Sequence, residues 1–286
     1  MRDLVRRAVQ WAIDVAEGLA AWGTRLLRGR GVRRAWLVVA ALAAVPMLAF
    51  GTMQAASALA HEERTEVAEV DAAGLGGVVI DNEAGSVNVV GVAGADTVTV
   101  HARISEGLRA TGHGVVERDD TLFVRGSCPV FGSEWCGVDY TIEVPADLYV
   151  NVDADEGVTV SDVSGGLVAH SSAAAVELAR VGGDVTVSAN QGRLEGTDLT
   201  AEHVTATANQ GRLSLEFAAS PDSIAAQANQ GSVHIVLPDD EDVAYATEAQ
   251  ANQGTVSDRI RQDPGSLRSI VVQANQGSIT IAYASS

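Results

Sequence analysis

The tetrapeptide Ala-Asn-Gln-Gly occurs five times in the C-terminal third of this 286-residue chain, and its glycines lie 19, 20, 23 and 23 residues apart. A period near 20 residues is typical of stacked architectures, in which each unit buries its apolar side only against its neighbours. Both flanks of the tetrapeptide alternate apolar and polar residues, as in VTATANQGRLSLEF at 204–217. This alternation predicts two strands per repeat, with the tetrapeptide forming the corner between them.

The corner residues are predicted to have structural roles. Glycine reaches a positive φ without strain, and asparagines that stack about 4.8 Å apart can bond to one another through their amides. The predicted corner ladder consists of Asn190, Gly192, Asn209, Gly211, Asn229, Gly231, Asn252, Gly254, Asn275 and Gly277. A catalytic or ligand-binding role for the tetrapeptide is the alternative, although five identical sites on one chain would be unusual.

Weaker copies of the repeat end at Gly157 and Gly85, and another surrounds Ser172. We therefore predict an all-β fold, a β-solenoid of about 17–23 residues per coil, with seven coils from Gly157 onward and one isolated coil near Gly85. The last coil ends at Ile279, Ile281 and Tyr283 with no capping element after it. An uncovered edge of this kind predicts self-association or docking of a partner at the C-terminal end.

The first 60 residues differ in composition from the rest. Residues 1–34 hold eight arginines and three acids, a charge of +5, so the remainder carries −23 of the total −18. No charged residue occurs at 35–60, a stretch long enough for one transmembrane helix. The arginines before it predict a cytoplasmic N-terminus and an extracytoplasmic C-terminal domain. The strongly acidic remainder argues against nucleic-acid binding.

Two alternatives remain open at this end. Ala58-Leu59-Ala60 before His61 resembles a signal-peptidase site, so the protein would be secreted after cleavage there. Apolar residues at helical spacing within 2–29 predict a basic amphipathic helix, with an unstructured basic tail as the alternative. The predicted organisation is a cytoplasmic amphipathic segment at 1–34, a transmembrane helix or signal sequence at 35–60, a linker at 61–69 and the solenoid at 70–286.

Cys128 and Cys136 are the two cysteines of the chain. They flank a Gly- and Pro-containing turn between two predicted strands, so we expect a disulfide that closes a hairpin at 126–138 outside the cytoplasm. A redox-active or metal-binding pair is the alternative, but seven intervening residues and no nearby histidine match no common zinc spacing. Aromatic residues gather at the same place, and the candidate binding patch consists of Phe123, Phe131, Trp135 and Tyr140. Packing of these rings as a lid over the first coil is the other interpretation.

The order of these motifs resembles the bacterial "putative adhesin" family of surface domains. The resemblance rests on VVIDNEAGSVNVVG (78–91), DYTIEVPADLYVNVDADEGVTV (139–160) and the repeated tetrapeptide, and it covers about residues 70–286. It implies a single-stranded β-helix displayed outside the cytoplasmic membrane. The family supplies no catalytic residues to transfer.

No sequence motif for catalysis, nucleotide binding or calcium repeats occurs, and the six histidines are scattered. The acidic run Asp239–Asp242 is interpreted as a solvated loop, with weak calcium binding as the alternative. We therefore predict a non-enzymatic adhesin or envelope scaffold that needs no cofactor and binds an envelope glycan or protein. The alternatives are a polysaccharide-active β-helix enzyme and a sensor of an envelope-stress system.

Overall fold

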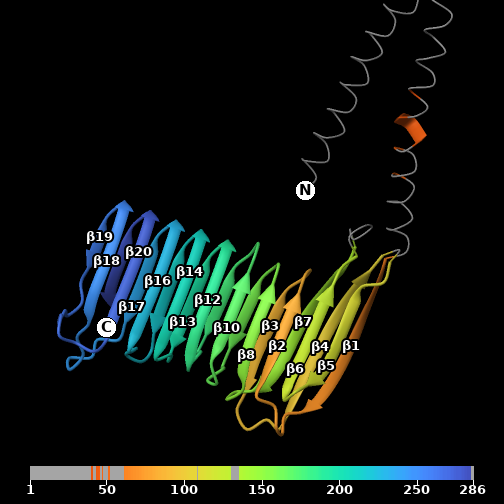
Figure 1. The fold of residues 1–286 in the computed structure, drawn as a ribbon, viewed down its shortest axis with the longest axis horizontal. Coiled ribbons are helices and arrows are strands. Elements are labelled where there is room, and N and C mark those ends of the chain that lie inside the picture. Colours follow the sequence, from red (N-terminus) through yellow and green to blue (C-terminus); the bar gives the residue numbers. More distant parts are fainter. Residues whose placement is uncertain are drawn as a thin grey trace, which may run out of the picture. The chain divides into compact units, whose positions relative to one another are not determined.

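The computed structural model describes residues 61–107, 109–129 and 135–284, together with six isolated residues between 40 and 51. The described part from residue 61 onward consists of strands joined by short connections (Figure 1). The strands are β1 (Glu62–Asp71), β2 (Gly77–Asn82), β3 (Val87–Val92), β4 (Thr97–Glu106), β5 (Gly112–Arg118), β6 (Thr121–Ser127), β7 (Gly137–Pro145), β8 (Tyr149–Ala154), β9 (Val158–Ser161), β10 (Leu167–Ser171), β11 (Val176–Ala179), β12 (Asp184–Gln191), β13 (Leu194–Leu199), β14 (His203–Gln210), β15 (Leu213–Phe217), β16 (Ser223–Gln230), β17 (Val233–Leu237), β18 (Ala246–Gln253), β19 (Val256–Asp258), β20 (Ser269–Gln276) and β21 (Ile279–Tyr283).

The strands form two mixed sheets, one of 11 strands and one of 10. Successive strands of each repeat go to different sheets: β12 lies in the second sheet, for example, and β13 in the first. We call such a pair of successive strands, one in each sheet, a rung. Neighbouring rungs pair in parallel, as β12 does with β14 and β14 with β16. The alternating pattern thus yields strands that bury one face and expose the other.

The core lies between the two sheets and is built from small aliphatic side chains in columns. The register aligns Val185, Val204, Ile224 and Ile270 in one such column, and all four are buried. Burial of each valine or isoleucine contributes about 1.5–3 kcal/mol. Alanines such as Ala189, one residue before the asparagine, form another buried column.

The rungs at the N-terminal end do not follow chain order. The repeat near Gly85, formed by β2 and β3, pairs directly with β8 and β9, so the prediction of an isolated coil is wrong. The rung β6–β7 lies outside β2–β3, and antiparallel strands complete this end: β1 and β4 in the first sheet, and β5 in the second. Residues 61–69 were expected to be a linker but belong largely to β1, because they pair along their length with β4.

The C-terminal end is inverted in the same way. The last strands, β20 and β21, insert between β16–β17 and β18–β19 (Figure 1). The prediction that Ile279, Ile281 and Tyr283 form an open edge is therefore wrong, because β21 pairs with β17 on one side and with β19 on the other. The edge strands at this end are β18 and β19.

The inward-facing side chains explain this order. Thr247 and Asp258 of the outer rung occupy the register positions of Ile270 and Ile281, which are fully buried. An aspartate buried between two rungs would lose its water contacts without compensation, whereas Asp258 at the end of the stack stays partly exposed and accepts bonds from Ile260 N and Gln262 Nε2. The Thr247 hydroxyl is buried without a hydrogen-bond partner even at this end. The more apolar rung is inside, and the more polar rung covers it.

Among the described residues, no helix has the length and apolar character needed to cross a bilayer. The predicted amphipathic segment at 1–34 lies outside the described residues. The predicted span at 35–60 does too, apart from the six isolated positions.

Candidate functional site

The repeated corner glycines have a positive φ, between 130° and 153° at Gly192, Gly211, Gly231, Gly254 and Gly277. Each also lies so close to the next rung that a Cβ would overlap a backbone carbonyl, as at Gly231 with the oxygen of Gly211. Two independent constraints, conformation and space, therefore require glycine at these corners.

The corner asparagines form a continuous chain of amide hydrogen bonds. Asn209 Nδ2 donates to Asn190 Oδ1 and Asn229 Nδ2 to Asn209 Oδ1, both at 2.6 Å. Asn275 Nδ2 donates to Asn229 Oδ1 at 2.9 Å, and Asn252 Nδ2 to Asn275 Oδ1 at 2.7 Å. All bonds run in one direction, and the order follows the inverted rungs. Since the Oδ1 atoms of Asn190, Asn209, Asn229 and Asn275 each accept from a neighbouring rung, this ladder stabilises the stack.

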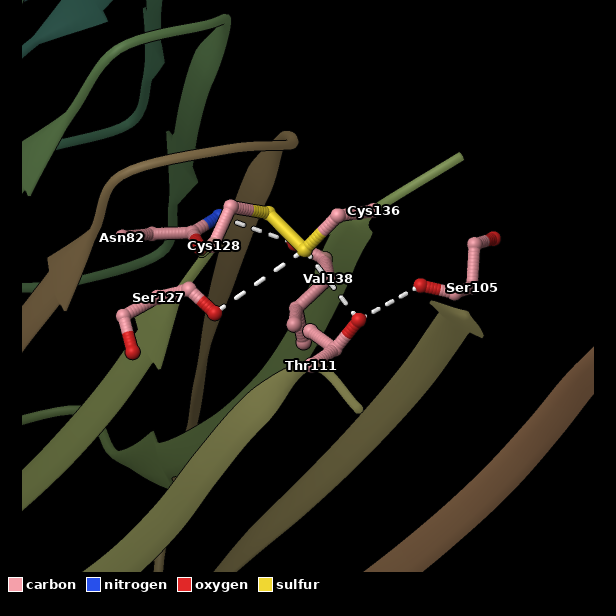
Figure 2. Close-up of a disulfide and its surroundings, with 7 residues drawn as sticks. All are labelled: Asn82, Ser105, Thr111, Ser127, Cys128, Cys136 and Val138. Carbon is pink, nitrogen blue, oxygen red and sulfur yellow. Dashed lines mark hydrogen bonds between the residues drawn. A yellow bond between two sulfur atoms is a disulfide. The ribbon is translucent and has the colours of Figure 1, made fainter. Parts of the chain in front are cut away.

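The predicted disulfide between Cys128 and Cys136 is confirmed, with an S–S distance of 1.99 Å and a Cα–Cα distance of 5.8 Å. The expected hairpin is wrong: β6 and β7 lie in different sheets, so the bridge closes a corner of one rung. Neighbouring polar groups surround it (Figure 2). Thr111 Oγ1 lies 3.1 Å from Cys136 Sγ and donates to Ser105 O at 2.7 Å, while Asn82 Nδ2 donates to Val138 O at 2.8 Å.

The four predicted aromatic residues do not form one surface patch. Tyr140 is buried with its ring against Gly126, and its hydroxyl donates to Arg125 O at 2.9 Å. Phe123 and Trp135 are each 41% exposed, but Trp135 packs on the ring of His61 whereas Phe123 faces out from β6. Phe131 lies outside the described residues.

Phe123 instead lines a groove of about 530 Å³ on the outer face of the second sheet. The register of β2, β6 and β5 places Val79, Phe123 and Val116 in one row across the three strands. Val116 is 52% exposed. The lining residues are Val79, Asp81, Gly112, His113, Gly114, Val116, Arg118, Phe123, Val124, Arg125 and Ser127.

A charged row lies beside the apolar one. Arg125 donates from Nη2 and Nε to Asp81 Oδ2 at 2.7 and 3.0 Å. Gly114 on β5 lies opposite Arg125 in the same register, and a Cβ added to Gly114 would meet nothing within 4 Å. The missing side chain leaves the groove open beside the ion pair.

His113 supports the groove from within. Because the single proton of the Tyr140 hydroxyl goes to Arg125 O, His113 Nδ1 must donate to Tyr140 Oη, 2.8 Å away. His113 Nε2 faces Glu66 Oε2 on β1 at 3.7 Å. Burial lowers the pKa of the His113 imidazole, against the opposing effect of Glu66, and burial also raises the pKa of the Tyr140 phenol.

Sequence reasoning found Phe123 but missed Val79, Val116 and His113. Their grouping depends on the antiparallel pairing of β5 with β6, which the repeat pattern does not contain.

The acidic residues Asp239–Asp242 lie in the loop after β17, where Asp239 pairs with Arg261 at 2.9 Å. Within residues 61–107, 109–129 and 135–284, no group of three His, Cys, Asp or Glu side chains is placed to hold a metal ion.

Comparison with known proteins gives limited information. No family model and no curated protein matches the chain. A "putative cell adhesion protein" from Clostridium sporogenes is 14% identical with a TM-score of 0.34, covering 78% of this chain and 100% of that one. "Putative adhesin" structures from Bacteroides fragilis (14% identical, TM-score 0.35, 77% and 97% covered) and Parabacteroides merdae (11%, 0.28, 78% and 97%) are similar to the same extent. Because all three TM-scores are below 0.5, we draw no conclusion about fold or function from these similarities.

Proposed function

We propose that this chain is a non-catalytic, membrane-anchored β-solenoid outside the cytoplasm, and that it binds a cell-envelope glycan through the groove of Val79, Val116 and Phe123. The observation that carries this proposal is the apolar row, open to solvent on a sheet that a disulfide braces nearby. Exposed aromatic and aliphatic side chains on a rigid scaffold are a common basis of recognition.

The size and chemistry of the groove favour a glycan over a protein surface. Its volume of about 530 Å³ lies within the range of small-ligand sites, whereas a stable protein interface needs about 800 Å² from each partner. The ring face of Phe123 can pack against the C–H face of a sugar. Asp81 and Arg125 lie beside it as hydrogen-bond partners for hydroxyl groups.

The proposed location rests on the disulfide and on the N-terminal sequence. Structural disulfides persist in oxidising compartments, and the bond between Cys128 and Cys136 agrees with a position outside the cytoplasm. The uncharged stretch at 35–60 supplies the proposed anchor, with secretion after cleavage before His61 as the alternative outcome. Self-association at the C-terminal end, if present, would use β18 and β19.

Sedimentation with purified peptidoglycan tests the proposed function. Every buried core side chain lies between residues 78 and 281, so the fragment 61–286 contains the whole described core. We expect this fragment to co-sediment, and Phe123→Ala or Val116→Ser to weaken binding about tenfold. Val271→Ser is the matched control, since Val271 is 37% exposed on β20 of the same sheet.

Three outcomes would contradict the proposal. Unchanged binding of both groove variants would exclude the groove, and capture of envelope proteins without glycan would identify a protein-binding module. Release of reducing ends from the glycan would instead favour the polysaccharide-active enzyme.

A further inference from the structure

The strand register gathers three separate segments on one rim of the domain. Glu62 at the start of β1 pairs with Glu106, and the neighbouring Ser105 pairs with Gly137 at the start of β7. Residue 61, the connection after β4 and the disulfide corner therefore lie together. The contact of 3.1 Å between Thr111 Oγ1 and Cys136 Sγ joins the last two (Figure 2).

Trp135 lies directly on the first described residue of the domain. Its ring centroid is 5.0 Å from that of His61, with the two planes tilted by 43°. The side chain remains 41% exposed although its neighbour Cys136 is fixed by the disulfide. A large aromatic ring is thus held at a defined place but only partly covered by protein.

The sequence before His61 indicates what lies next to this ring. The uncharged stretch at 35–60 ends one residue earlier, and consecutive Cα atoms are only about 3.8 Å apart. If this stretch spans the bilayer, His61 lies at the headgroup level, and Trp135 lies at the same depth. Tryptophan is enriched at that level because its ring is apolar and its indole N–H can bond to polar groups.

The charges on this rim are partly paired with one another. Glu63 pairs with Arg103 at 2.8 Å, and Arg64 pairs with Glu106 at 2.8 Å and Glu66 at 2.9 Å. Two arginines therefore offset half of the charge of the four carboxylates Glu62, Glu63, Glu66 and Glu106. Arg109 is exposed in the connection between β4 and β5, where it can meet lipid phosphates.

We propose that Trp135 is a second membrane contact, inserted at the headgroup level. This proposal rests on the membrane anchor of the proposed function. It gives the disulfide a role besides stability, since the bond fixes the backbone that carries the ring.

Depth-dependent fluorescence quenching tests this contact in the full chain. The chain has four tryptophans, so the variant W11F/W22F/W36F leaves Trp135 as the sole emitter. In phosphatidylcholine vesicles, we expect lipids brominated near the headgroup to quench Trp135 and its emission to shift to shorter wavelengths. Quenching by aqueous acrylamide with no effect of the brominated lipids would overturn the proposal.

A matched control places the emitter on the groove. The variant W11F/W22F/W36F/W135F/F123W carries its indole on the outer face of β6, and we expect acrylamide to quench it while brominated lipids do not. Alkaline carbonate extraction tests the anchor separately. Loss of the chain from the vesicles would contradict the proposed anchor, whereas retention without lipid quenching of Trp135 would contradict only the second contact.

Discussion

Thr247 lies opposite Ile270 in the parallel register of β18 and β20, so a polar side chain covers an apolar one at the C-terminal end of the stack. After β17 the chain first forms the outer rung β18–β19, and then β20 and β21 fill the position between this rung and β16–β17. Arg261 holds the crossing segments: it pairs with Asp239, donates to Val243 O, and lies 4.8 Å from the centre of the Tyr283 ring. The capping element of this repeat domain is thus an internal segment of the sequence.

Exchange of side chains between these two rungs tests the order. We expect Ile281→Asp to lower the free energy of unfolding by more than about 4 kcal/mol, because it buries a carboxylate between rungs. Asp258→Ile should change it by only about 1–2 kcal/mol, through loss of the bonds from Ile260 N and Gln262 Nε2. If β18 and β19 lay inside instead, urea unfolding would show the reverse ranking.

The corner glycines tolerate no side chain. At Gly231 we expect alanine to destabilise the domain by about 2–4 kcal/mol, from the left-handed φ of 146° and the overlap with Gly211 O. Gly114→Ala is the control, since its Cβ would meet open space, and it should stay within about 0.5 kcal/mol. Equal melting temperatures for the two variants would contradict the close packing of the corners.

The asparagine ladder should be more sensitive in the middle than at its end. Asn229 both donates and accepts a ladder bond, whereas Asn252 only donates one. We expect Asn229→Leu to cost about 2–3 kcal/mol and Asn252→Leu less than about 1 kcal/mol in chemical unfolding. Similar losses at both positions would show that the side-chain bonds do not determine the effect.

Removal of the disulfide should weaken the N-terminal end of the stack. For a bridge across a sequence separation of 8, we expect the Cys128→Ser/Cys136→Ser variant to lose about 2.5 kcal/mol. A reducing agent should lower the melting temperature of the natural protein but not of the variant. Two free thiols in protein isolated from its native source without a reducing agent would contradict the oxidised state.

His113 should make stability depend on pH. Its pKa is lowered in the folded protein by burial, so the unfolded chain binds more protons below a pH of about 6.5. The contribution of neutral His113 to the free energy of unfolding is therefore fully present above about pH 6.5, and it decreases as the pH falls. We expect His113→Asn, which keeps a donor toward Tyr140, to reduce this slope in unfolding experiments between pH 5 and 8; an identical slope would exclude His113 as its source.

The sequence alone determined the repeating unit of this protein, a pair of strands joined at a corner. Alternation around each Ala-Asn-Gln-Gly predicted strands with one buried face, because period two follows directly from backbone geometry. It also predicted the disulfide between Cys128 and Cys136, and it left open whether Phe123 faces solvent or packs over the first coil. These features depend on residues close together in the chain, whose local preferences are readable from their order.

Only the tertiary structure decided which rungs touch. Ile270 and Thr247 both fit the repeat, and their different positions follow from burial, which depends on the completed stack. In the same way, the sequence groups Tyr140 with the surface aromatics, but its ring is buried against Gly126. Val116 joins Phe123 through the antiparallel pairing of β5 with β6. A local pattern specifies the face that a residue presents, whereas competition among similar rungs for the interior specifies its neighbours.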